Sequence, residues 1–254
     1  MTVDRPDRFD ALARRLGLIV HESPDPDSVT ASTLSFVAAQ LTRAIQDRGR
    51  GVLAVSGGRS PKALLEGLSR WPLDWSRVTV VLVDERAVGA LHPLSNTASI
   101  RSWLIKGEAA CADFRSFVPE TVDTGLCPVT LAERAAAAYP GGAIIDVALL
   151  GLGLDGHFAS IFTGADEFDA LVDPTHSAIY LPVHLPSPPA EAPVHRVTLT
   201  LARLLEARCL VMPLGSTEKR SVFEQACERL DPRWPVSLLI RQQRNTLHLW
   251  LTRS

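Results

Sequence analysis

The sequence predicts an α/β fold: a modified Rossmann-like, mainly parallel sheet flanked by helices on both faces. Short apolar, β-branched runs alternate with helical patterns along most of the chain, which is typical of parallel strands joined by crossover helices. The 254 residues are 46% apolar and 21% charged, enough for one packed core. We therefore expect a single domain over residues 1–254, with its ligand site beyond the carboxyl ends of the strands.

The alternation can be followed through the chain. Apolar residues recur at three- and four-residue steps in the expected helices, and Gly49 follows the first of them. Ser60 and Pro61 suit the cap and the first residue of the next helix. We expect helices at 28–49, from 60 onward, at 96–105 and at 216–230; strands at 51–55, 78–83, 144–150, 178–183, 194–201, 209–214, 236–240 and 246–251; and loops at 84–95 and 185–195, the second of them Pro-rich.

Composition and charge exclude several classes of protein. The formal net charge is −2 and no basic stripe is visible, so we expect no nucleic-acid partner. The first residues lack an apolar signal segment, and the apolar run at 143–154 is short and broken by Asp146, which predicts a cytoplasmic protein with no membrane partner. The four cysteines are widely spaced, without a C-x-x-C pair, and no metal-ligand cluster is visible. We expect idle thiols and no metal.

The first loop with chemical potential is V-S-G-G-R-S-P at 55–61. Gly57 and Gly58 let the backbone approach an anion, and Ser60 precedes a helix whose first N–H groups are unpaired. We expect a phosphate to bind here. Because no G-K-[ST] follows, the loop is not that of a nucleotide triphosphatase. The alternative is a tight turn in which Ser60 only caps the helix.

A second loop, directly after the strand at 78–83, concentrates polar side chains. Five hydrogen-bonding groups at the carboxyl end of a buried strand exceed what a turn requires, so we expect a binding or catalytic role. The alternative is a solvated loop in which the first carboxylate only orients the arginine or accepts from backbone N–H groups. The five are Asp84, Glu85, Arg86, His92 and Asn96.

The third loop contains G-x-G-x-x-G at Gly151, Gly153 and Gly156, which in other chains marks a dinucleotide site. Here Asp155 would place a carboxylate where the pyrophosphate should lie, so we expect no NAD and no other cofactor. We expect the glycines instead to let the backbone turn sharply and expose His157 at the start of a short helix. A histidine beside an acidic partner suits a general base.

Two isolated basic residues follow. Arg196 opens the run R-V-T-L-T after the Pro-rich loop, and Lys219 lies four residues after Gly215, at the start of an expected helix. Surface charge is the alternative for each. Lysine is scarce in this chain, which makes the position of Lys219 informative.

Taken together, these motifs resemble the 6-phosphogluconolactonase family in its bacterial single-domain form. They are S-G-G-x-S-P, D-E-R followed by H-x-x-S-N, L-L-G-x-G-x-D-G-H-x-A-S-I-F, R-V-T-L-T and the late P-V-S-L-L, in order from about residue 20 onward. The resemblance implies hydrolysis of 6-phospho-D-glucono-1,5-lactone to 6-phosphogluconate in the pentose phosphate pathway. It also implies a fold shared with glucosamine-6-phosphate deaminases and isomerases and with sugar-phosphate sensor domains.

The resemblance implies roles for single residues. His157 would deprotonate the attacking water, and Asp155 with the 84–86 cluster, Asp84 foremost, would orient it and the sugar hydroxyls. Those implied to bind the substrate or its phosphate are Gly57, Gly58, Ser60, Glu85, Arg86, His92, Asn96, Arg196 and Lys219. We expect a small-molecule sugar-phosphate lactone as the partner, no metal and no cofactor, and a monomer or weak homodimer.

The sequence departs from the family pattern in three places. Arg59 stands where a small serine is common, Ser60 replaces the usual threonine, and Gly215 and Lys219 are one residue further apart than in G-x-x-K. Whether Arg59 contacts the phosphate stays open.

Two rivals share the fold. A deaminase or isomerase typically continues its histidine loop as Ala-Phe-Asn-Glu-Pro, whereas this chain continues with Ala159-Ser160-Ile161-Phe162 and lacks the extra carboxylate. A non-catalytic sensor would need a DNA-binding helix-turn-helix, and residues 1–27 are too short and too acidic to supply one. Both comparisons favour the lactonase.

Overall fold

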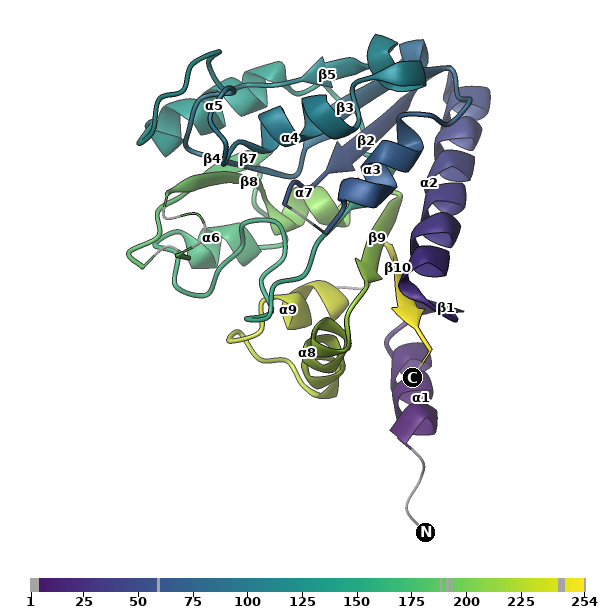
Figure 1. Ribbon diagram of the computed structural model, residues 1–254. Helices are drawn as coiled ribbons and strands as arrows, with labels where there is room; N and C mark the ends of the chain where they lie inside the picture. Colours follow the sequence, from purple (N-terminus) through teal and green to yellow (C-terminus); the bar gives the residue numbers. More distant parts are fainter. Residues whose placement is uncertain are drawn as a thin grey trace.

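The fold class predicted from the sequence is confirmed. The structure, a computed structural model, describes residues 5–58, 60–187, 189–190, 192, 194–241 and 245–253. Within them a seven-stranded sheet, parallel at every pairing, forms the centre of the molecule, and helices pack around it (Figure 1). Its strands in spatial order are β1 (Ile19–Ser23), β10 (Thr246–Thr252), β9 (Cys209–Leu214), β6 (Val147–Leu149), β2 (Gly51–Val55), β3 (Val78–Leu82) and β5 (Asp113–Arg115).

The strand order reverses beside β2. From β2 the chain proceeds outward to β3 and β5, and it then returns to place β6 on the opposite side of β2. The loops that leave β2 and β6 therefore diverge from neighbouring strands at one edge of the sheet. In open α/β sheets, ligands bind in the crevice that such a reversal creates.

A second, smaller sheet combines two of the predicted strands with a segment for which the sequence predicted a loop. Its three antiparallel strands, in spatial order, are β4 (Asp84–Arg86), β8 (Arg196–Leu199) and β7 (Tyr180–Val183). The polar residues of β4 carry no strand pattern of their own. They are extended because β8, more than a hundred residues later in the chain, supplies their backbone partners.

Helices pack on both sheets. On the main sheet, α2 contacts β1, β2, β9 and β10, and α3 and α4 pack beside it. Helix α8 contacts β9 as well as α1 and α9, while α5 packs on β7 and β8 of the second sheet (Figure 1). The helices are α1 (Arg5–Arg15), α2 (Pro26–Arg48), α3 (Lys62–Leu68), α4 (Asn96–Trp103), α5 (Pro128–Ala138), α6 (Phe168–Val172), α7 (Leu201–Leu205), α8 (Thr217–Glu228) and α9 (Val236–Arg241), with short 3-10 turns at Trp75–Arg77 and Gly107–Cys111.

The caps of the first two predicted helices differ from expectation. Helix α2 begins two residues before Ser28, because the Asp25 side chain accepts the Ser28 N–H at 2.8 Å and caps it. Gly49 ends α2 in a left-handed conformation, as expected. In contrast, α3 begins at Lys62 without a side-chain cap, so the prediction that Ser60 caps this helix is wrong.

Two further local predictions are wrong. The run at 236–240, predicted as a strand, forms α9, because a short apolar run after a proline fits a buried helix as well as a strand. No helix begins at His157. That residue lies in an irregular turn, and the next helix is α6 at Phe168.

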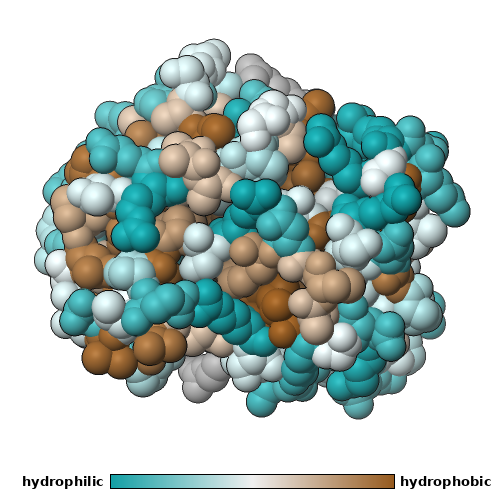
Figure 2. All heavy atoms as spheres, turned by 90° about the horizontal axis from the view of Figure 1, so that it is seen from above, coloured by the Kyte–Doolittle hydropathy of each residue, from teal (hydrophilic) through white to brown (hydrophobic). Residues whose placement is uncertain are grey.

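One hydrophobic cluster extends from Phe9 to Leu251 and buries both faces of the central strands. Every residue of β2 and β6 is buried, so the loops that follow them leave from a rigid platform. Seen from above, the surface mixes polar and charged residues with small apolar patches (Figure 2). Within the described residues, no helix has the length and apolar character needed to cross a membrane.

Candidate active site

The three loops singled out in the sequence emerge at the same edge of the sheet. They follow β2, β3 and β6, which are parallel and adjacent in the order β6-β2-β3. The backbone joins them as well, since Ser56 donates to the carbonyl of Leu149 at 3.2 Å and Val83 donates to that of Val55 at 2.8 Å. The edge is thus built by main-chain bonds between strand ends.

Gly57 packs directly against Asn96. A Cβ atom at Gly57 would lie 2.0 Å from Asn96 Oδ1, so this position accommodates only glycine. Asn96 is 1% exposed, and its Nδ2 donates to the main-chain oxygen of Asp84 at 2.8 Å, while its Oδ1 has no hydrogen-bond partner. The first and second loops are therefore in contact through one buried amide.

Glu85 is fully buried and accepts the first N–H groups of α4, a helix whose N-cap residue is Ser95. Its carboxylate accepts the N–H groups of Asn96 and Thr97 at 2.7 Å each, that of Arg86 at 2.7 Å, and the Ser95 hydroxyl at 3.2 Å. Burial raises the pKa of this carboxyl, and the three backbone donors oppose that shift. In this structure the Glu85 carboxylate holds the second loop on the first turn of α4, and its contact with a substrate stays a prediction.

Asp84 connects the second and third loops. Its Oδ2 accepts the Ser160 hydroxyl at 2.5 Å, and Ser160 N–H donates to Thr198 Oγ1 at 3.2 Å. Both Asp84 and Ser160 are buried. Between His157 and Ser160 the chain reverses at Ala159, which has a φ of 51° and is the one non-glycine residue with positive φ in the described part of the chain. This turn keeps Ser160 inside while His157 stays accessible.

His157 and Asp155 form a pair at the tip of the third loop. His157 Nδ1 lies 2.5 Å from Asp155 Oδ1, and the same oxygen accepts the His157 main-chain N–H at 3.2 Å. Partial burial raises the pKa of Asp155, but the hydrogen bond and charge of His157 outweigh it, so the pKa lies below its ordinary value. The Asp155 carboxylate thus keeps its charge beside a partly exposed imidazole.

Two arginines lie beside this pair. Arg86 and Arg196 face each other across β4 and β8, and Phe162 connects Arg196 to the histidine: the guanidinium lies 5.2 Å from the ring centre, and the His157 ring stacks on the same ring at 4.1 Å. Burial and the charge of Arg86 lower the pKa of Arg196 to about 10, against the opposing carboxylates of Asp84, Glu85 and Asp155. Nε of each arginine is buried without a partner. Two adjacent guanidinium groups with free donors can hold an anion.

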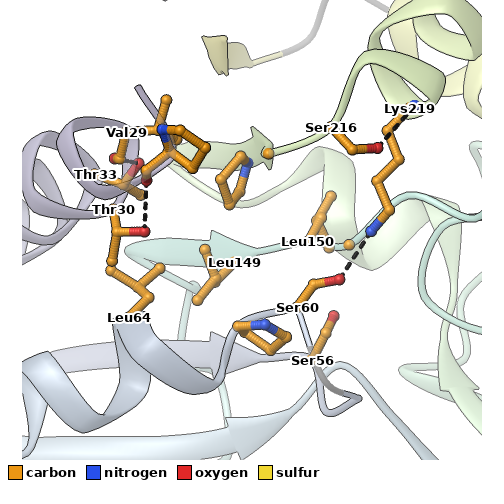
Figure 3. Close-up of a pocket in the computed structure, with 15 residues that line it drawn as sticks. Val29, Thr30, Thr33, Ser56, Ser60, Leu64, Leu149, Leu150, Ser216 and Lys219 are labelled. Carbon is orange, nitrogen blue, oxygen red and sulfur yellow. Dashed lines mark hydrogen bonds between the residues drawn. The ribbon is translucent and has the colours of Figure 1, made fainter. Parts of the chain in front are cut away.

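Lys219 and Ser60 meet at the rim of a pocket of about 320 Å³, although 159 residues separate them. Lys219 Nζ donates to Ser60 Oγ at 2.8 Å, and burial lowers the pKa of Lys219 (Figure 3). Ser216 caps α8 beside them, so the N-terminus of this twelve-residue helix faces the same pocket. The pocket is lined by Pro26, Val29, Thr30, Thr33, Ser56, Ser60, Pro61, Leu64, Leu149, Leu150, Gly151, Pro213, Gly215, Ser216 and Lys219.

The structure also places residues that the sequence analysis did not select. Ser56 lines the pocket with a buried hydroxyl that has no hydrogen-bond partner. Phe162 and Trp234 contact the third loop, the latter against Gly156. Ser160 and Phe162 belong to the quoted H-x-A-S-I-F run, so their proximity in the chain to His157 was the available signal. Trp234 had none, because it is remote in the chain.

The remaining expectations can be placed as follows. His92 is half-buried, and its Nδ1 accepts the Leu94 N–H at 3.1 Å, which closes the turn before α4. Arg86 donates to the Leu94 carbonyl at 2.7 Å. Gly58 has a φ of 84° and open space around it. Arg59 lies outside the described residues, as do three positions of the 185–195 loop. Among the described residues, no group of three or more His, Cys, Asp and Glu side chains is arranged to hold a metal ion.

Comparisons with known proteins identify the family to which this chain belongs. The family model described as glucosamine-6-phosphate isomerases/6-phosphogluconolactonase matches residues 24–250. The 6-phosphogluconolactonase of Mesorhizobium japonicum is 37% identical over 220 residues, which cover 85% of this chain and 88% of that protein. The same-named protein of Neisseria meningitidis serogroup A is 35% identical and covers 91% of this chain and 97% of its own length. A crystal structure of a 6-phosphogluconolactonase from Shewanella baltica matches with a TM-score of 0.84 at 29% identity, covering 93% of this chain and 98% of that one. The chain therefore belongs to the glucosamine-6-phosphate isomerase/6-phosphogluconolactonase family.

Proposed function

We propose that this protein hydrolyses 6-phospho-D-glucono-1,5-lactone to 6-phosphogluconate, with His157 as the general base. Two relatives that are 37% and 35% identical to this chain over the aligned residues carry the name of that activity. The observation that carries the mechanism is the 2.5 Å contact between His157 Nδ1 and Asp155 Oδ1. A carboxylate at Nδ1 favours the tautomer in which Nδ1 carries the proton, which leaves the lone pair of Nε2 free.

The reaction then needs only proton transfers and a defined approach of water. Nε2 of His157 removes a proton from a water molecule while the oxygen of that water bonds to C1 of the lactone. The Asp155 carboxylate stabilises the imidazolium that forms. When the C1–O5 bond breaks, the ring oxygen takes the proton back, and the open-chain acid is released. General-base assistance of this kind contributes about 10²–10⁴ in rate. A lactone ester is labile, so the proposal invokes no further chemical group.

The phosphate of the substrate belongs, in this proposal, beside Lys219 and Ser60. There the Lys219 ammonium, the Ser60 hydroxyl and the N-terminus of α8 face one pocket, and each of them favours an anion. Gly57 and Gly58 turn the backbone at its edge.

Besides the pocket at Lys219, the structure has a second group of positive charges, formed by Arg86 and Arg196. The resemblance implied that Arg196 binds the phosphate. In the structure Arg196 adjoins Arg86 and lies over Phe162, on which His157 stacks. We propose that the two guanidinium groups bind oxygen atoms of the substrate near the reacting end, with Asp84 and Asn96 holding the loops around them.

The test follows lactone decay. Glucose-6-phosphate and its dehydrogenase generate the lactone in place, and NMR measures its disappearance with and without the protein. We expect the parent to accelerate decay and His157→Ala to lower kcat by about 10²-fold or more. His176→Ala is the matched control, since His176 lies in the turn before β7 and not in the three loops, and it should keep parental turnover.

Each possible failure has a distinct meaning. A parent protein that leaves the spontaneous rate unchanged would contradict the proposed activity. A His157→Ala variant with full turnover would contradict only the general-base role.

A further inference from the structure

A segment from the C-terminal part of the chain lies against the loop that carries His157. This segment, residues 231–237, is here called the brace, and residues 153–157 are called the histidine loop. Val236 N–H donates to the carbonyl of Gly156 at 2.9 Å. A Cβ atom at Gly156 would lie 2.8 Å from Cε3 of Trp234 and 3.1 Å from its Cα. The brace therefore contacts the histidine loop one residue before His157.

The brace is itself held in a fixed shape. Ser237, which is fully buried, accepts the Asp231 N–H through its hydroxyl at 2.9 Å and returns a bond to the Asp231 carbonyl at 2.8 Å. Trp234 N–H donates to the same carbonyl at 2.8 Å, and the Arg233 guanidinium bonds the Asp231 carboxylate at 2.8 and 3.0 Å. Such a closed network resists deformation, so it can fix the position of what it contacts.

The histidine loop, in contrast, is closed mainly on itself. Gly153 N–H donates to the His157 carbonyl at 2.8 Å, and Gly156 N–H donates to the Gly153 carbonyl at 3.0 Å. The His157 ring also lies directly over Gly153, where a Cβ atom would be 2.1 Å from Nδ1. These contacts determine the shape of the loop, but they do not determine its tilt relative to the sheet. That tilt depends on contacts from outside the loop, of which the brace supplies two.

We propose that Trp234 is a positioning residue: by packing on Gly156 it sets the orientation of the histidine loop and thereby the direction in which His157 faces the substrate. The inference rests on the proposed function for its kinetic consequence, but not for its structural one. Gly156 has a φ of 77° and no side chain, so the indole meets the backbone itself and any movement of the loop is resisted directly. A displacement of a catalytic group by about 1 Å can cost about 10²-fold in rate.

The kinetic test compares three variants. Trp234→Ala should lower kcat by about tenfold or more while KM changes by less than about threefold, because substrate contacts are retained and only the base is misplaced. Trp234→Phe keeps a planar ring and should recover most of the lost kcat. The matched control is Trp103→Ala, which removes another partly buried tryptophan at the end of α4 and should leave kcat within about threefold of the parent.

A second measurement does not depend on turnover. Hydrogen exchange at the Val236 amide, which bonds the brace to the Gly156 carbonyl, and the ring signals of His157 in ligand-free protein report how firmly the brace holds the histidine loop. Trp234→Ala should speed exchange at that amide by about tenfold and broaden or split the His157 signals, while Trp103→Ala should change neither. If Trp234→Ala does not fold, Trp234→Phe and Trp234→Leu give graded replacements on which the same exchange is measured.

The outcomes separate the two proposals. Exchange and kcat that stay at parental values in Trp234→Ala overturn the inference, as does an equal loss of kcat in Trp103→Ala. A parent without lactonase activity contradicts the proposed function, and the exchange experiment then decides the role of Trp234 alone.

Discussion

Replacing Gly57 by alanine tests how the first two loops are joined. The added methyl group would lie 2.0 Å from Oδ1 of Asn96 and 2.3 Å from its Cγ. Asn96 cannot simply rotate away, because its Nδ2 donates to the Asp84 carbonyl at 2.8 Å and its main-chain N–H is held by Glu85 at 2.7 Å. The Asn96 amide must leave its site, and the bond to Asp84 must break.

The expected cost combines two effects. Leaving buried hydrogen-bonding groups unpaired costs about 1–3 kcal/mol. Forcing an extra carbon into a packed site costs a further 1–3 kcal/mol or so, since the surrounding side chains leave their rotamers. We therefore expect Gly57→Ala to lower the free energy of unfolding by about 2–6 kcal/mol. This is a large share of the about 5–15 kcal/mol that stabilises a typical domain.

Urea unfolding of the parent and of four variants measures this. Gly164→Ala is the control, because Gly164 has open space and needs no positive φ, so it should change stability by less than about 0.5 kcal/mol. Asn96→Ala removes the atoms nearest to the new methyl group, so the double variant should be more stable than the sum of the single effects predicts, by at least about 1 kcal/mol. Additive effects, or a Gly57→Ala protein as stable as the parent, would refute the reasoning.

Two further predictions concern buried groups. Glu85→Ala leaves three backbone N–H groups without an acceptor, two of them in buried bonds, so unfolding in urea should show a loss of about 3 kcal/mol or more. Unchanged stability with lost turnover would instead indicate substrate contact. Burial and the charge of His21 lower the pKa of His248 to about 4, so the folded state resists protonation. The unfolded chain binds this proton near pH 6.5, so the contribution of His248 to the free energy of unfolding is complete above that pH and is lost as the pH falls toward 4. Because the side chain is half exposed, we expect the loss to be about 1–2 kcal/mol. Unfolding midpoints from pH 8 to 4 should show this fall in the parent and a smaller one in His248→Gln; parallel curves would contradict it.

Local sequence was sufficient to locate an element or a pair of side chains when the residues that determine it are adjacent in the chain. The strand at Gly51–Val55 and the strand at Cys209–Leu214 were located to the residue, because a buried parallel strand is a continuous apolar run with polar neighbours. The Asp155–His157 pair could be expected as well, since the two side chains are two residues apart and no distant contact is needed to bring them together.

The errors occurred where the partner is remote in the chain. Ser60 has the composition of a helix cap, but its hydroxyl accepts from Lys219. Asp84–Arg86 has the composition of a loop, but β8 makes it a strand. The run at 236–240 is apolar enough for either kind of element, and the tertiary packing around α9 made it a helix.

The amino-acid sequence alone determined the class of fold, the order of the central strands' apolar runs, and the three loops that carry the polar residues. These follow from periodicity and turn chemistry, which act over a few residues. Only the tertiary structure decided which polar groups stay free for a ligand. The Glu85 carboxylate accepts N–H groups from the first turn of α4. Arg86 and Arg196, in contrast, each keep an Nε donor without a partner. The physical reason is that a buried polar group bonds to whatever donor or acceptor the fold places next to it, and that neighbour is set by long-range packing, not by adjacent residues.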